Sequence, residues 1–218
     1  METLLPLLTA LLLGSVHAIE ADHVAAVSSF AVRRPRPGAA MLFGLRWALG
    51  HGGVVILLGM AFVLLGIELP EAAGHWLERL VGVGLVALGA WTLASARTMH
   101  AHLHTHADGT THFHLHSHLT REDHHHGHAA TAMGALHGLA GTAPVVALIP
   151  LAGLGSPVFA AGYLLLFAIG TAAGMAVFAM LAGWIAGRAA GRSARLARAI
   201  AWGTGVITVA LGLVWLFR

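Results

Sequence analysis

The stretch HAIEADH, residues 17–23, places two histidines and two carboxylates inside an otherwise apolar segment. The residues are His17, Glu20, Asp22 and His23, in the spacing H-x4-D-H. Each charge costs about 2.5–3.5 kcal/mol at the centre of a bilayer, so a cluster of four ionisable groups indicates a functional site. Imidazole and carboxylate together suit a divalent transition-metal ion. The alternative interpretation is that the four groups join neighbouring helices through hydrogen bonds.

A continuous helix cannot direct all four side chains at one point. At 100° per residue, Asp22 lies about 140° round the helix from His17. The apolar segment that holds them, 3–31, is also longer than one perpendicular membrane span. We therefore predict a break near residues 14–23, where irregular backbone can line a cavity and the four groups can converge.

Two single histidines lie in glycine-rich helical segments. His51 stands in LGHGGVV, where neighbouring glycines let another helix or an ion approach closely. His137 opens HGLAGTAPVVALIP, whose glycines and prolines predict a kinked or interrupted helix. A lone buried histidine is more often a packing residue. Beside the first cluster, we predict His51 as a metal ligand and His137 as a secondary ligand or gate.

A histidine tract, HAHLHTHADGTTHFHLHSH, occupies residues 100–118. Histidine alternates on both sides of an Asp108-Gly109 turn, and this period of two predicts a β-hairpin. The expected register pairs 106 with 112, 104 with 114, 102 with 116 and 100 with 118. HHHGH at 124–128 adds four more imidazoles. The predicted loop ligands are His100, His102, His104, His106, His112, His114, His116, His118, His124, His125, His126 and His128.

The tract is expected to collect or sense metal rather than to transport it. Neutral imidazoles bind Ni²⁺, Co²⁺, Cu²⁺ or Zn²⁺ and release them as the pH falls below the unperturbed imidazole pKa near 6.5. A purification tag would lie at a terminus and would not alternate with Leu, Phe and Thr. A flexible low-complexity tract is the other interpretation, because a lone two-stranded hairpin is marginal in water.

The composition identifies a membrane protein, since 57% of the 218 residues are hydrophobic and 10% are charged. The basic residues are all arginine and the net charge is +3, which argues against nucleic acid as a partner. With no cysteine, a metal must bind through nitrogen and oxygen. Glu2 and the lack of an N-terminal positive charge argue against a signal peptide.

Apolar stretches predict an all-α membrane protein with six transmembrane helices. For a transporter of this kind, we expect no catalytic cofactor. They cover residues 3–31, 39–67, 74–97, 130–152, 157–187 and 197–217. Arginine clusters fall on alternate connections, so the positive-inside rule places both termini outside and the histidine tract in the cytoplasm. The site is expected in a bacterial-type inner membrane, with the lipid bilayer and divalent metal ions as partners.

The sequence divides into two similar halves, 1–97 and 129–218, on either side of the predicted cytoplasmic metal-binding loop 98–128. His17 matches His137 at an offset of 120, and WALGHGGVV at 47–55 matches FAIGTAAGM at the same offset. ALGAW at 87 and ALGLVW at 210 match after a small slip. Two halves of three helices in opposite directions form the 3+3 inverted repeat of many transporters.

HAIEADH and LGHGGVV, with the histidine-rich loop, resemble the nickel/cobalt transporter superfamily, in particular its efflux and urease-accessory-type branch. The resemblance implies secondary transport of Ni²⁺ or Co²⁺, with His17, Asp22, His23 and His51 essential for recognition. The chain departs from the larger permeases, which have about eight spans. In an efflux protein the loop would collect excess metal, and in an importer it would buffer the metal that arrives. The sequence therefore leaves the direction of transport open.

Two other functions are compatible with some of these residues. A membrane metal sensor or chaperone would act through the histidine-rich loop, which also suits Zn²⁺. An intramembrane metalloenzyme would need a set of ligands plus a base, and the sequence has no HExxH motif. The sequence therefore predicts a transporter rather than an enzyme.

Overall fold

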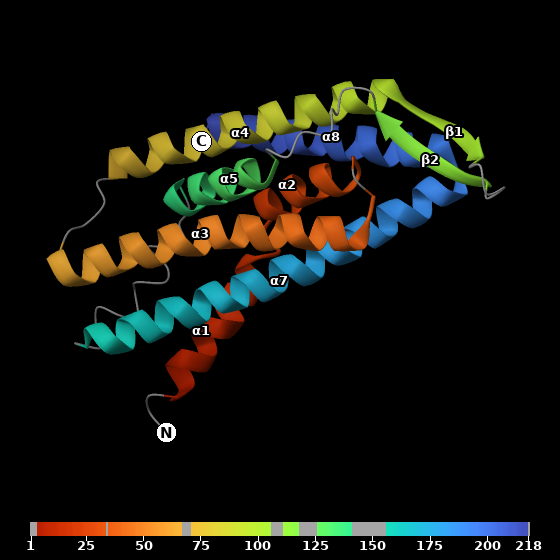
Figure 1. Cartoon of the computed structure of the whole chain (residues 1–218). Helices are drawn as coiled ribbons and strands as arrows, with labels where there is room; N and C mark the ends of the chain where they lie inside the picture. The colour runs from red at the N-terminus through yellow and green to blue at the C-terminus, as the bar shows by residue number, and fades with distance from the viewer. Residues whose placement is uncertain are drawn as a thin grey trace.

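The computed structural model describes residues 4–33, 35–66, 71–105, 111–117, 126–140 and 156–217. Its long helices lie along one another as a bundle, with a β-hairpin at one end (Figure 1). The elements are α1 (Leu4–His17), α2 (Ala21–Ala31), α3 (Pro37–Leu65), α4 (Glu71–Thr98), β1 (Met99–Thr105), β2 (Thr111–Ser117), α5 (His126–Ala140), α7 (Pro157–Arg192) and α8 (Ala194–Leu216).

Four helices in the described part of the chain are long and apolar enough to cross a membrane, and the bent pair α1 and α2 makes a fifth candidate. The four are α3, α7, α8 and the part of α4 from Gly74 to Thr98. The predicted span 130–152 is described only as far as Ala140, the end of α5. The remainder of that predicted span lies outside the described residues.

The predicted break in the first span is confirmed. α1 ends at His17, α2 begins at Ala21, and their axes differ by 53°. Glu20 adopts extended backbone angles, φ −64° and ψ 154°, as the N-cap of α2. A helix cannot continue through an extended residue, so the direction of the chain changes between the two halves of the H-x4-D-H motif.

Glycines let the helices cross at backbone contact. Gly14 of α1 packs against the backbone carbonyl of Phe167 in α7. Gly134 of α5 packs in the same way against the backbone carbonyl of Trp47 in α3. A Cβ on either glycine would collide with the oxygen of that carbonyl. The two contacts are related by the offset seen in the sequence, since 14 + 120 = 134 and 167 − 120 = 47.

The same crossings carry a second pair of reciprocal contacts. Gly170 lies on the carbonyl oxygen of Leu11, and Gly50 lies on that of Thr131. These residues again differ by 120, since 50 + 120 = 170 and 131 − 120 = 11. The crossing of α1 on α7 therefore has a residue-by-residue counterpart in the crossing of α5 on α3.

Helices α4 and α8 also pack against each other through reciprocal glycine contacts. Here the offset is 123 residues, the one that relates ALGAW to ALGLVW. A Cβ on Gly82 would lie 2.8 Å from the carbonyl oxygen of Gly212, and one on Gly205 would lie 3.2 Å from that of Gly89. The residues correspond because 82 + 123 = 205 and 212 − 123 = 89. The contacts of α1 with α7, of α3 with α5 and of α4 with α8 thus all include glycine positions related by these offsets.

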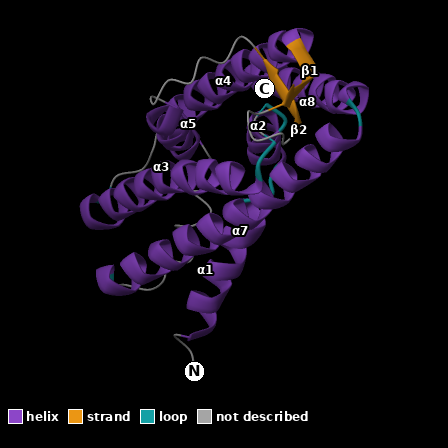
Figure 2. Ribbon diagram, turned by 45° about the vertical axis from the view of Figure 1, so that its right-hand side comes forward, coloured by secondary structure: helices purple, strands orange, loops and turns teal. Residues whose placement is uncertain are grey.

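The histidine-rich segment contains the antiparallel hairpin β1–β2, which contacts the ends of α4 and α8 (Figure 2). The predicted register is wrong by two residues: His100 pairs with His116, His102 with His114 and His104 with His112. A shift of two preserves the alternation, so histidine positions still face histidine positions across the strands. The loop is also shorter than predicted, because α5 begins at His126.

Candidate metal centre

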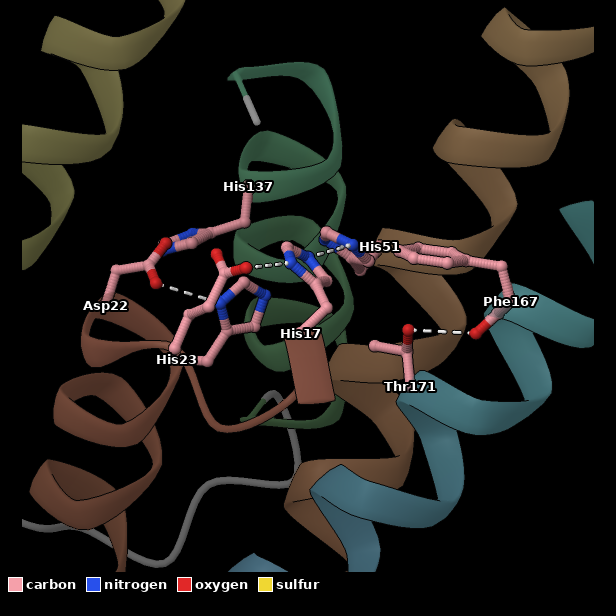
Figure 3. A network of polar contacts seen from close by, with 8 residues as sticks. His17, Asp22, His23, His51, His137, Phe167 and Thr171 are labelled. Atoms are coloured by element: carbon pink, nitrogen blue, oxygen red, sulfur yellow. Dashed lines mark hydrogen bonds and ion pairs between the residues drawn. The ribbon is translucent and has the colours of Figure 1, made fainter. Parts of the chain in front are cut away.

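The broken helix brings four elements together around one polar cluster (Figure 3). His17 is the last residue of α1, and Asp22 and His23 lie in the first turn of α2. His51 comes from α3 and His137 from α5. All five residues are buried, with exposed fractions of 7% or less.

Two groups of potential ligands overlap at His23. One ligand atom from each of His17, His23 and His51 lies within 4.8 Å of the others, and the same holds for Glu20, Asp22 and His23. The first group is fully buried, whereas Glu20 of the second is exposed. His23 is therefore the residue through which an ion at either position would be held.

Three of these histidines have their hydrogen-bonding oxygen at Nδ1 rather than at Nε2. Nδ1 of His17 lies 2.9 Å from Oε1 of Glu20, and Nδ1 of His23 lies 3.0 Å from Oδ1 of Asp22. Nδ1 of His137 donates to the carbonyl oxygen of Met133 at 3.2 Å. Oxygens that only accept place the proton on Nδ1, so the lone pair is on Nε2. Metal-binding histidines are oriented in this way by their outer partners.

The Nε2 atoms of His17 and His51 face each other at 3.2 Å. A single ion with metal–nitrogen bonds of about 2.0–2.1 Å holds two adjacent ligands about 2.9–3.4 Å apart, for octahedral to tetrahedral angles. The observed separation lies inside that range. Nε2 of His23 is buried and has no hydrogen-bond partner among the described residues, so it is available as a third ligand.

The charge of the cluster also fits a divalent cation. With neutral imidazoles, Glu20 and Asp22 carry −1 each and sum to −2. Among the described residues, the ion-pair contacts of these two carboxylates are with His17, His23 and His137 rather than with arginine. One divalent ion would therefore neutralise a net charge that is costly inside a membrane.

His137 lies at the cluster but in a different position from the other histidines. Its Nε2 is 3.8 Å from Oδ2 of Asp22, and its ring centroid is 5.4 Å from that of His23. It is outside both groups of ligand atoms. The described geometry thus places His137 beside the carboxylate of Asp22, where a small movement would make it a ligand.

Two aromatic rings that were not predicted from the sequence pack against histidines of the cluster. The ring centroid of Phe167 lies 5.5 Å from that of His17, and the centroid of Trp47 lies 4.7 Å from that of His137. Both aromatic side chains are buried. Phe167 and Trp47 are the first residues of the two matched motifs, so the offset of 120 was the signal that pairs them.

The loop histidine positions that the structure describes lie on β1, β2 and the first turn of α5, outside this cluster. His128 is exposed in the first turn of α5, and strand positions such as His102 and His114 are described by their backbone pairing. The predicted ligands His106, His118, His124 and His125 lie outside the described residues. The buried centre is therefore built by α1, α2, α3 and α5.

A family model described as the cytochrome c biogenesis protein transmembrane region matches residues 6–214. The chain belongs to this membrane family. It is also 30% identical to the urease accessory protein UreH of Bacillus sp. (strain TB-90), over 99% of this chain and 92% of UreH. No solved structure matches the chain.

Two plant relatives extend the similarity to longer proteins. The chloroplast proteins FOR GROWTH AND FERTILITY 2 and 1 of Arabidopsis thaliana are 27% and 26% identical to the chain, over 97% and 94% of its length. The chain spans 56% and 57% of those two proteins. The family membership and the apolar helices together identify an integral membrane protein.

Proposed function

We propose that the protein is a secondary transporter of divalent transition-metal ions, Ni²⁺ or Co²⁺ first. The observation that carries the proposal is the buried convergence of His17, His23 and His51, two of them with Nδ1 held by a carboxylate. An ion that enters a membrane must exchange its water for other ligands, and imidazole nitrogen suits nickel and cobalt. The similarity to a urease accessory protein supports a nickel-related membrane role.

The reciprocal glycine contacts support an inverted repeat as the basis of transport. In such folds, the two halves rock about a site near the middle of the membrane. Phe167 against His17 and Trp47 against His137 occupy corresponding positions in the two halves. We assign these rings as the covers that move aside in turn, each exposing the site to one face of the membrane.

The orientation follows from the distribution of arginine. Arg33, Arg36, Arg97, Arg188 and Arg192 lie at or near the ends of helices that meet at the hairpin end of the bundle (Figure 1). Both termini lie towards the other end. The positive-inside rule then places the hairpin in the cytoplasm and the termini outside, in a bacterial-type inner membrane. Histidines that release the ion can take up protons, so proton exchange is the natural driving force.

Metal flux into liposomes tests this function. The purified protein would be reconstituted with an internal metal-quenched dye, and entry of Ni²⁺ and Co²⁺ followed under a pH gradient of either sign. We expect flux for the wild type and a loss to background for His17→Ala, because the facing pair of Nε2 atoms is removed. His75→Ala is the matched control, since His75 is exposed on α4 outside the cluster. A wild type without flux under both gradients would contradict the proposal.

A membrane metal sensor or chaperone is the second candidate, and the hairpin with its paired histidine positions favours it. Deletion of residues 100–125 distinguishes the two functions. A transporter should retain flux, with a changed apparent affinity, because the buried centre lies on other elements. A sensor would lose its metal response entirely. The same liposome assay, with metal titrated over a wide range, measures the first outcome, and metal titration of the purified protein measures the second.

A thiol-based electron-transfer role is excluded for this chain acting alone. Thiol–disulfide exchange needs cysteine, and the sequence has none. The membership of a family named for cytochrome c biogenesis therefore defines the membrane region without supplying redox chemistry here.

A further inference from the structure

A groove of about 240 Å³ lies where α7 and α8 meet, at the arginine-rich end of the bundle. Only Ser193 separates the two helices, and its side chain accepts from the backbone amides of Arg195 and Leu196 at the start of α8. The groove is lined by Trp184, Ile185, Arg188, Ala189, Arg192, Leu196 and Ile200. Because the turn is so short and capped, the two walls are held by one rigid junction.

Two arginines of this groove have no counter-ion among the described residues. Arg188 and Arg192 are exposed and one helical turn apart on α7. No described carboxylate forms an ion pair with either one. The guanidinium of Arg188 lies over the ring of Trp184 at 4.9 Å, which holds its charge at the mouth of the groove.

The other residues that line the groove are apolar, apart from the indole N–H of Trp184. Ile185 is seven residues before Arg192 on α7, which corresponds to about 10 Å along the helix axis. Trp184, Ile185 and Leu196 are exposed, and tryptophan is typical of the membrane interface. Positive charge therefore stands above an apolar channel, in the order in which a phospholipid presents its phosphate and its acyl chains.

We propose that this groove binds an anionic phospholipid of the arginine-rich leaflet. Arg188 and Arg192 would hold the phosphate, and an acyl chain would lie between the α7 and α8 walls. Basic pockets between transmembrane helices on the cytoplasmic side bind anionic headgroups in this manner. Attraction of Arg192 to the C-terminal end of α7 explains one charge, but neither the second arginine nor the apolar channel below it.

The full chain in detergent, examined by native mass spectrometry, tests the site. Phosphatidylglycerol and phosphatidylcholine with identical acyl chains would be titrated separately, with inorganic phosphate as a third probe. We expect phosphatidylglycerol to bind roughly 10- to 30-fold more tightly than phosphatidylcholine, as two basic contacts predict. Arg188→Gln/Arg192→Gln should remove this preference.

The matched control removes two charges from the same end outside the groove. Arg195→Gln/Arg198→Gln should keep most of the preference, because neither residue lines the groove. Leu196→Trp should weaken phosphatidylglycerol binding while all arginines remain, since the larger ring fills the channel. The proposal is overturned if both double variants lose the preference equally, or if inorganic phosphate competes fully with the lipid. It is also overturned if the wild type shows no lipid preference, as would happen if a second copy of the chain covered the groove in a dimer.

Discussion

Replacing His23 with alanine is expected to lower metal affinity more than any other single substitution in the centre. His23 belongs to both groups of ligand atoms, so its loss leaves neither group complete. Removal of an outer partner of a metal ligand usually costs about 10- to 100-fold in affinity. Loss of a shared ligand should exceed this range, and we expect a decrease of more than about 100-fold with transport abolished.

Glu20→Gln provides the comparison for His23→Ala. The amide keeps an oxygen beside Nδ1 of His17 but removes the negative charge, so we expect a smaller decrease of about 10-fold. Affinity for Ni²⁺ and Co²⁺ would be measured by calorimetry in a chain whose loop histidines are replaced by asparagine, so that the buried centre alone is titrated. Equal losses for Glu20→Gln and His23→Ala would show that charge, and not ligation by His23, governs binding.

The helix break at the centre could be predicted from the sequence, because a continuous helix cannot direct all four ionisable side chains at one point. Four ionisable groups in an apolar segment could converge only if the helix broke, and the break between His17 and Ala21 follows from that condition. Glycine beside His51 predicted close approach, and the structure specifies which glycine serves which neighbour. Gly50 meets the backbone of α5 and Gly52 meets Ala168 of α7, whereas a Cβ on Gly53 would meet nothing within 4 Å.

Other features depend on three-dimensional contacts that a linear pattern does not contain. Nε2 of His17 lies 3.2 Å from Nε2 of His51, and Nε2 of His137 lies 3.8 Å from Oδ2 of Asp22, and only packing of different helices creates these two contacts. The hairpin register was missed by two residues for a different reason. Alternation fixes which positions share a face, but every even shift satisfies it equally, so the turn decides the register.

Substitution of Gly50 by alanine is expected to destabilise the fold strongly, because Gly50 lies at the crossing of α3 and α5. Its Cβ would collide with the carbonyl oxygen of Thr131 and approach the backbone nitrogen of Ala135 to 2.9 Å. Backbone cannot rotate aside as a side chain can, so the two helices must separate. Overpacking of this kind costs about 1–3 kcal/mol or more, which corresponds to a fall of roughly 2–12 °C in Tm for a chain of this size.

Gly53→Ala, three residues further along the same motif, should have the opposite sign. The added methyl group meets open space, and alanine favours a helix over glycine by about 1 kcal/mol. Thermal unfolding in detergent, followed by tryptophan fluorescence, would compare both variants with Gly170→Ala. Gly170 occupies the corresponding crossing of α7 on α1, where a Cβ would meet the carbonyl oxygen of Leu11. If the two halves are equivalent, Gly50→Ala and Gly170→Ala should lower Tm by similar amounts. If Gly170→Ala leaves Tm unchanged, the crossing of α7 on α1 is packed less tightly than that of α3 on α5, and the two halves are not equivalent.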